Sequence, residues 1–419
     1  MTSRERVKNA LNFRQPDRIP VDFGATAVTG IHASIVEKLR EYYGLEKRPV
    51  RIHEPFQMLG WVDDDLAAVL GIDTVPAMPR GTMFGNLNTA WKPWRTPWGQ
   101  EVLIAADTEF TAEPDGSIAV YPGGDRAAGP SARLTAGGFF FDAIIRQQPF
   151  DEDNPSIEDN LEEFTVLSDA VIGEIAASCR EAAATGRAVA CGGPGTALGD
   201  IALVPATQLK APKGIRDVAE WYMSLLLRPD FVKGVFARQT EIAIENLKKL
   251  NRAAGKDIDV LFLCGTDFGT QISTFCNAET FRELYLPYYR QMTDYIHAET
   301  GWKVFKHSCG AVMPLIDCFV EAGFDILNPV QCSAAGMDPV ELKRRFGRKM
   351  TFWGGGVDTQ KVLPFGTPSE VKSQVLERCR IFGEGGGFVF NSVHNIQAKT
   401  PIGNIAAMFD AVREFNQKG

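Results

Sequence analysis

Eight short runs of β-branched and aromatic residues divide the chain, and each is separated from the next by sequence that can contain a helix. Alternation of strands and helices favours a parallel sheet with covering helices, and eight such units are typical of a (β/α)8 barrel. The sequence therefore predicts an α/β protein of the TIM-barrel type. The runs lie at residues 19–23, 72–78, 188–191, 260–264, 303–307, 325–330, 350–353 and 388–390.

The gap between the second and third runs is longer than the others and has a different composition. Residues 80–160 are rich in glycine, proline and tryptophan. Short alternating stretches at residues 101–104 and 117–121 are typical of hairpins. We therefore expect residues 1–419 to form one barrel domain, with a hairpin-rich insertion after the second strand that helps to shape the mouth of the barrel.

Helix boundaries are marked most clearly in the C-terminal half. The segment Thr367-Pro-Ser-Glu370 combines a hydroxyl N-cap, a proline in the first turn and a capping-box glutamate. Asn277 opens another helical segment that runs to Tyr295, and Pro287 predicts a kink or break within it.

The composition indicates a folded globular protein and excludes several classes of partner. The chain has 419 residues, of which 45% are hydrophobic and 23% charged, so it can bury a large core. A net charge of -8 argues against a nucleic-acid partner, which selects for basic surfaces. No apolar run approaches the ~20 residues needed to cross a membrane. Eight scattered cysteines suit a reducing compartment, and the first residues lack the apolar core of a signal peptide, so we expect a cytoplasmic protein.

Four apolar runs in the C-terminal half end in polar or metal-ligating residues. The most informative ends in His307-Ser-Cys309-Gly, and Asn391 and His394 follow the last run. In an α/β barrel the carboxyl ends of all strands meet on one face, so side chains far apart in the sequence converge there. The residues that we expect to share a pocket are His307, Cys309, Cys332, Asp358 and His394.

His307 and Cys309 project from the same side of the strand end, because side chains alternate along a strand. Neutral imidazole and thiolate are zinc ligands, and a site with an open position needs three protein ligands. His394 and Cys332 are the candidates for the third. His307 and Cys309 are also compatible with ordinary core residues. His394 is equally compatible with a histidine that binds substrate, and Cys332 with a thiol that lines the pocket.

Three further polar residues are candidates for substrate contacts or proton transfer. Asp267 follows the fourth run, where a carboxylate can exchange a proton or orient a metal ligand; an aspartate that only caps a turn is the alternative. Gln271 offers an amide. Asp358 follows three glycines, which permit close approach to a ligand or serve a tight turn. Residues 192–196 lack the lysine of a phosphate loop, so we do not expect a nucleotide.

Together these motifs resemble the uroporphyrinogen decarboxylase superfamily, and more particularly its corrinoid-linked methyltransferase-like branch. The resemblance extends over nearly the whole chain, is most specific in the C-terminal half, and implies a (β/α)8 barrel. It is carried by Arg4-Glu-Arg-Val-Lys-Asn-Ala-Leu, Pro16-Asp-Arg-Ile-Pro20, His307-Ser-Cys309-Gly, Gly355-Gly-Val-Asp358 and His394-Asn-Ile-Gln-Ala-Lys-Thr400-Pro401.

Motifs separate the two branches of this superfamily. Decarboxylases carry an N-terminal Arg-Gln-Ala-Gly-Arg segment whose arginines bind the carboxylates of a tetrapyrrole, whereas residues 21–30 contain no arginine. The methyltransferase branch holds zinc with a His-x-Cys pair and a cysteine shortly before a Thr-Pro helix start. His307 and Cys309 match the pair, and His394 takes the third position with a ligand that zinc accepts.

The resemblance implies a zinc-dependent methyltransferase. Zinc on His307, Cys309 and His394 would act on a small methylated substrate, such as a methoxylated aromatic (O-demethylation), a methylamine or a thiol. The methyl group would pass to or from the cobalt of a corrinoid (cobalamin) on a carrier protein. His307 and Asp267 are the expected catalytic residues. The expected substrate contacts are Gln271, Cys332, Asp358 and Asn391.

The alternative is a metal-independent carboxy-lyase of the decarboxylase type that acts on an acidic substrate, with Asp73 or Asp267 as its key carboxylate. A binding protein that keeps the barrel without turnover is a third interpretation. A homodimer built on a barrel helix is compatible with each of them.

Overall fold

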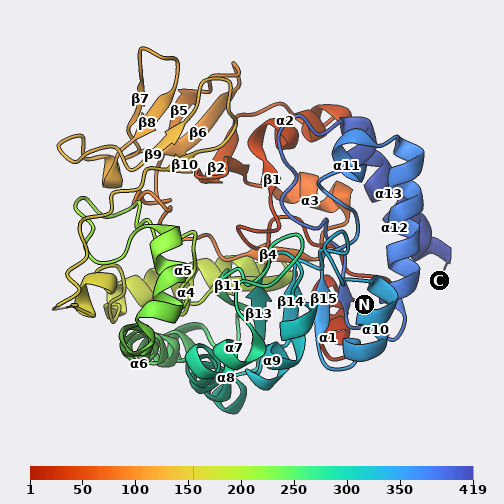
Figure 1. Ribbon diagram of the computed structural model, residues 1–419. Coiled ribbons are helices and arrows are strands. Elements are labelled where there is room, and N and C mark those ends of the chain that lie inside the picture. Colours follow the sequence, from red (N-terminus) through yellow and green to blue (C-terminus); the bar gives the residue numbers. More distant parts are fainter. Residues whose placement is uncertain (154, 419) are drawn as a thin grey trace.

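A curled sheet of seven parallel strands forms the centre of the protein in this computed structural model, in which residues 1–153 and 155–418 are described (Figure 1). The seven predicted runs after the first correspond to these strands one to one. In spatial order the strands are β16 (Phe388–Val389), β15 (Thr351–Trp353), β14 (Ile326–Asn328), β13 (Lys303–His307), β12 (Val260–Cys264), β11 (Ala188–Gly192) and β4 (Thr74–Pro76).

The first predicted run, residues 19–23, contributes a single bridge instead of a full strand. Val21 pairs in parallel with Phe390, and its carbonyl accepts the N–H of Asp73 at 2.8 Å. The N–H of Asp22 donates to the carbonyl of Phe390 at 2.9 Å. These contacts link the two outer strands, β16 and β4. The expectation of eight strands is therefore met in part, by a curled parallel sheet of seven.

Side chains on the concave face of the sheet fill its centre. Because side chains alternate along a strand, every second residue faces inward. Val7 and Leu11 of α1 (Ser3–Leu11) pack against this inner set. The inner set includes Ala188, Ala190, Val260, Phe305, Ile326, Trp353 and Val389.

Helix α1 also covers the amino-terminal end of the sheet. Its Arg4 binds Asp259 at 2.9 Å, and its Arg6 binds Asp73 at 2.7 Å. Both carboxylates lie immediately before a strand, Asp259 before β12 and Asp73 before β4. The opposite, carboxyl-terminal end is the end at which α/β barrels place their sites.

Helices cover the outer face of the sheet (Figure 1). The predicted capping box of Thr367 and Glu370 is present, and Pro287 coincides with the expected break, since α7 ends at Leu284 and α8 begins at Leu286. Beside α1, the helices are α2 (Ala33–Tyr42), α3 (Asp64–Leu70), α4 (Asp169–Ala184), α5 (Val218–Leu227), α6 (Pro229–Ala254), α7 (Ala278–Leu284), α8 (Leu286–Glu299), α9 (Ile316–Glu321), α10 (Pro339–Phe346), α11 (Val362–Phe365), α12 (Pro368–Gly383) and α13 (Ile402–Lys418), with short 3-10 turns η1 (Pro122–Gly124), η2 (Glu158–Asn160) and η3 (Met313–Leu315).

Two further sheets lie to one side of the parallel sheet, at the upper left of Figure 1. One is an antiparallel sheet in the order β10 (Asp142–Ala143), β9 (Ala132–Leu134), β8 (Ile118–Val120), β7 (Phe110–Ala112). The other has the order β1 (Ile31–His32), β3 (Leu59–Gly60), β2 (Val50–Glu54), β6 (Glu101–Ala105), β5 (Trp91–Arg95).

The second of these sheets joins two distant parts of the chain. Strands β5 and β6 form an antiparallel hairpin, and β2 pairs with β6 in parallel. Sequence analysis did not predict β1, β2 and β3: β1 and β3 have only two residues each, and β2 pairs with the remote β6 as well as with the neighbouring β3. Within the described residues, none of the helices combines the length and apolar character that crossing a bilayer requires.

Candidate metal centre

Three metal-ligating side chains meet at the carboxyl-terminal end of the sheet. One ligand atom from each of His307, Cys309 and His394 lies within 4.8 Å of the other two, and we call these residues the His/Cys cluster. His307 is the last residue of β13, Cys309 follows it by two positions, and His394 follows β16. Curling of the sheet brings together strand ends that are separated by two intervening strands.

The spacing of His307 and Cys309 is compatible with chelation of a metal ion. The Sγ atom of Cys309 is 3.4 Å from Nε2 of His307, and the rings of His307 and His394 are 5.3 Å apart and nearly perpendicular. Ordinary Zn–N and Zn–S bond lengths at a tetrahedral angle place the two ligand atoms about 3.6 Å apart. The pair of His307 and Cys309 can therefore chelate a metal with little movement.

Hydrogen bonds to the two imidazoles differ. Nδ1 of His307 is 2.6 Å from Oδ1 of Asn328, which leaves Nε2 free for a metal. In His394, by contrast, Nδ1 accepts the N–H of Asn395 at 2.8 Å. A metal on either nitrogen of His394 requires this hydrogen bond to break, because Nδ1 would then hold the metal or a proton. His307 is thus the better prepared ligand.

Burial determines the protonation states in the metal-free cluster. It lowers the pKa of His307 to about 4 and that of His394 to about 3, so both rings are neutral at neutral pH, as metal binding requires. Burial, together with the charge of Asp267, raises the pKa of the Cys309 thiol well above its usual range. A divalent cation would supply the positive charge that favours the thiolate.

Asp267 borders the cluster. Its Oδ1 accepts the N–H of Cys309 at 2.6 Å and lies 3.8 Å from Nε2 of His307. Burial raises the pKa of this carboxyl, while the hydrogen bond from Cys309 lowers it. Asp267 therefore orients the Cys309 loop and stands where it can exchange a proton with a group at the cluster.

Gln271 is oriented by a residue that sequence analysis missed. The N–H of Gly310 donates to Oε1 of Gln331 at 2.8 Å, and Nε2 of Gln331 donates to Oε1 of Gln271 at 3.0 Å. Because a backbone N–H can only donate, the atom of Gln331 that faces Gly310 must be its oxygen. Its nitrogen therefore faces Gln271, and the atom of Gln271 that accepts from it must be an oxygen. Gln271 is exposed, and its free group is the Nε2 amide, a hydrogen-bond donor.

The other three expected substrate contacts are placed differently. Oδ1 of Asp358 accepts the N–H of Gln360, which forms an Asx-turn within its own loop. Cys332 lies outside the His/Cys cluster, and burial raises the pKa of its thiol to about 11. Among the described residues, only His394 completes the pair of His307 and Cys309 as a three-ligand group.

Asn391 is fully buried inside the sheet. Its Nδ2 donates to the carbonyls of Asp22 and Thr29, which fastens the 22–29 loop to the end of β16. Within the described residues its Oδ1 has no hydrogen-bond partner. Asn391 therefore fastens this loop through Nδ2, while its Oδ1 remains available as a hydrogen-bond acceptor.

Asp73, the other carboxylate that the decarboxylase alternative considered, lies outside the His/Cys cluster. Asp73 is fully buried at the amino-terminal end of β4, away from the cluster. It accepts hydrogen bonds from Arg6, Arg18, Ser3 and the N–H of Val21. With its oxygens occupied by these partners, it acts as a structural anchor for α1.

Lys306 is a second residue whose position sequence analysis missed. Its fully buried Nζ donates to the carbonyls of Thr266, at 2.5 Å, and His307, at 2.7 Å, and lies over the ring of Phe268. It thereby fastens the end of β12 to the end of β13. A lysine within an apolar strand run was the available signal.

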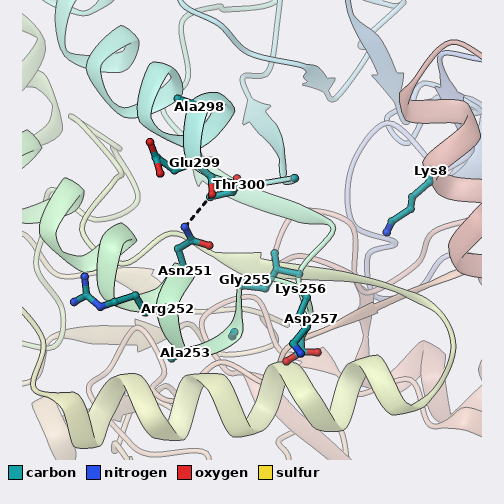
Figure 2. A pocket seen from close by; sticks show the side chains of 13 residues that line it. Lys8, Asn251, Arg252, Ala253, Gly255, Lys256, Asp257, Ala298, Glu299 and Thr300 are labelled. Atoms are coloured by element: carbon teal, nitrogen blue, oxygen red, sulfur yellow. Dashed lines mark hydrogen bonds between the residues drawn. The ribbon is translucent and has the colours of Figure 1, made fainter.

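A surface cavity of about 680 Å³ lies at the other end of the sheet. Figure 2 shows its wall at the C-termini of α6 and α8, where Asn251 donates to the carbonyl of Glu299, with Lys8 of α1 across the opening. Residues 255–258 of this wall precede β12. The cavity is therefore at the amino-terminal end of the sheet and does not include the cluster.

The fold and the His/Cys cluster describe an α/β protein with a candidate metal centre at the carboxyl ends of its strands. The uroporphyrinogen decarboxylase family model matches residues 182–415, more than half of the chain. The protein belongs to the uroporphyrinogen decarboxylase family, as the sequence motifs predicted.

Known proteins with similarity to the chain include uroporphyrinogen decarboxylases. That of Coxiella burnetii (strain Dugway 5J108-111) is 27% identical over 203 residues, which are 46% of this chain and 50% of the relative. That of Pseudoalteromonas translucida is 32% identical over 91 residues, 21% of this chain and 25% of the relative. The matched part of the chain thus spans about half the length of the Coxiella relative and a quarter of the Pseudoalteromonas relative.

Among solved structures, a methyltransferase from Methanosarcina mazei is similar over 99% of both chains, with a TM-score of 0.55 and 15% sequence identity. At this identity the similarity establishes a shared fold.

Proposed function

We propose that the protein is a zinc-dependent methyltransferase that moves a methyl group between a small methylated substrate and the cobalt of a corrinoid on a carrier protein. The observation that carries this proposal is the His/Cys cluster, whose three ligand atoms lie within 4.8 Å of one another. A methyltransferase with the same fold supports the reaction class. We further propose that the whole chain forms one barrel domain with an insertion at 80–160. In this barrel, residues 19–23 occupy the eighth strand position and close the sheet.

The residues of the chain have separable tasks in this reaction. His307 and Cys309, with His394 as the third ligand, would hold zinc, which supplies a Lewis acid for the heteroatom of the substrate or activates a thiol acceptor. Asp267 lies within 4 Å of His307 and is placed to take or give the proton of that heteroatom.

Gln271 is the substrate contact that the geometry supports best. Its Oε1 is occupied by Gln331, so its Nε2 amide is available to a hydrogen-bond acceptor. An ether oxygen or a carboxylate of a methoxylated aromatic offers such an acceptor, whereas a protonated methylamine does not. This favours an oxygen-bearing methyl donor over a cationic one.

Elemental analysis of protein purified without a histidine tag and without added metal tests the proposal. Near-stoichiometric zinc is expected in the wild type and its loss in His307→Ala. With zinc present, transfer of a methyl group from methoxylated aromatics to cob(I)alamin can be followed by the absorbance of the corrinoid. A metal-free wild type that added zinc does not reload would contradict the proposal.

The names of the curated relatives favour a second candidate, a metal-independent carboxy-lyase on an acidic substrate. Because Asp73 is bound by Arg6 at the amino-terminal end of the sheet, we assign the key carboxylate of this candidate to Asp267, whose carboxyl is buried. Carbon dioxide release from an acidic substrate by zinc-free protein, abolished in Asp267→Asn, would select it over the methyltransferase.

A further inference from the structure

Asn328 lies next to the cluster at the end of β14, where it pairs with His307 of β13. It is fully buried. Its Nδ2 donates to the carbonyl oxygen of Trp353 at 2.8 Å. A carbonyl can only accept, so this bond determines which end of the amide faces His307, namely Oδ1.

We propose that Asn328 is a positioning residue that holds His307 in the tautomer with its proton on Nδ1, and so keeps the lone pair of Nε2 directed at Cys309. Oδ1 of Asn328 and Nδ1 of His307 are 2.6 Å apart. Oδ1 is an acceptor, so Nδ1 must donate. The other tautomer would bring two acceptors face to face and leave both buried atoms unpaired, which is strongly unfavourable.

The amide of Asn328 is itself held by a buried chain of hydrogen bonds. Trp353, whose carbonyl accepts from Asn328, also donates its Nε1 to Asp22 at 2.7 Å. Asp22 in turn accepts the hydroxyl of Thr74 at 2.7 Å. Trp353 and Asp22 are fully buried. The orientation at His307 is therefore anchored across the interior of the sheet, on Asp22 and on Thr74 of β4.

The two histidines of the cluster are consequently not equivalent. His307 presents a lone pair on Nε2, whereas Nδ1 of His394 accepts the N–H of Asn395 and leaves the proton on Nε2. The inference about Asn328 concerns the metal-free protein; only its consequence for zinc rests on the proposed function. Outer groups that orient a ligating histidine in this way typically change metal affinity by 10- to 100-fold.

Nuclear magnetic resonance of metal-free protein with ¹⁵N-labelled histidine tests the tautomer directly. The signals of His307 are identified by their absence in His307→Ala. We expect a single neutral form with the proton on Nδ1 in the wild type, and a mixture of tautomers in Asn328→Leu. A wild-type His307 with its proton on Nε2 would overturn the inference, and this measurement needs no variant of Asn328 to fold.

Competition with a chelator gives the second readout. Asn328→Leu should raise the Kd for zinc about 10- to 100-fold. Asn328→Asp keeps an acceptor for Nδ1 and should stay within a few fold of the wild type. Asn404→Leu is the matched control, because Asn404 is a buried amide that donates to two carbonyls, of Leu363 and Gly366, away from the cluster.

The outcomes separate this inference from the proposed function. Unchanged tautomer and unchanged zinc affinity in Asn328→Leu would overturn the role of Asn328. An equal loss of zinc affinity in Asn404→Leu would do the same, by showing a general effect of lost stability. A wild type with the expected tautomer that binds no zinc would support the inference while overturning the methyltransferase.

Discussion

Single residues at the cluster combine burial with free ligand atoms. The thiol of Cys309 and the imidazole of His307 lie 3.4 Å apart, yet in the metal-free protein the burial of Cys309 keeps its thiol protonated. The short distance to a neutral imidazole would let both groups bind one cation, whose charge would favour the thiolate.

Replacing Cys309 by serine should therefore remove bound zinc and methyl transfer together, because a hydroxyl is a much poorer zinc ligand than a thiolate. Zinc content and turnover of the same preparation are the measurements. Cys276→Ser, in the loop before α7 and outside the cluster, is the control and should keep both. Retained zinc and turnover in Cys309→Ser would refute the metal centre.

Glu54 gives a prediction about pH at the residue scale. It is buried at the end of β2, and burial raises the pKa of its carboxyl from 4.5 to about 7. Between these values the folded state binds more protons than the unfolded state, so stability falls as pH rises. The shift corresponds to at most about 3 kcal/mol.

Glu54→Gln cannot ionise, so its free energy of unfolding should rise relative to the wild type between about pH 5 and pH 8. Urea denaturation at several pH values measures the difference. Glu101→Gln, at an exposed position at the start of β6, should show no such trend. A pH-independent difference between Glu54→Gln and the wild type would show that Glu54 is not held neutral.

At the scale of elements, features that depend on neighbouring residues were predicted from the sequence, whereas pairings between remote segments were not. The capping box of α12 and the break at Pro287 involve residues within a few positions of each other, and both were predicted from sequence. The pairing of β2 with β6 joins residues about fifty positions apart, and the residues around β2 contain no pattern that predicts it.

The anchor of α1 on β4 yields an element-scale prediction. Asp73→Ala leaves the buried guanidinium of Arg6 without one of its carboxylates, so it should cost about 3–5 kcal/mol of stability. Activity per folded molecule should remain. Urea denaturation and specific activity measure the two effects, and Asp257→Ala, at the same end but less buried, is the control. Full stability with lost activity would return Asp73 to the catalytic candidates.

At the scale of the whole molecule, a metal bound across the sheet should stabilise the fold. The ligands come from the ends of β13 and β16, so only the folded chain assembles them. Zinc at one hundred times its Kd should add about 2.7 kcal/mol to the free energy of unfolding.

Thermal unfolding with zinc and with a chelator measures this linkage. The wild type should unfold at a higher temperature with zinc, and the difference should disappear in His307→Ala. His297→Ala, which alters an exposed histidine paired with Asp325, should retain it. A zinc effect of equal size in His307→Ala would place the metal elsewhere.

The sequence by itself determined the seven strands of the sheet, the principal caps, the family and the pair of His307 and Cys309, because periodicity, capping and ligand spacing are local properties of a chain. Tertiary structure decided what depends on curvature and distance. It placed His394, which the family resemblance implied as the third ligand, close to the pair and left Cys332 outside. It also placed Asp73 at the amino-terminal end of the sheet and Asn328 against His307. These outcomes follow from which strand ends become neighbours when the sheet curls, and no local pattern encodes that.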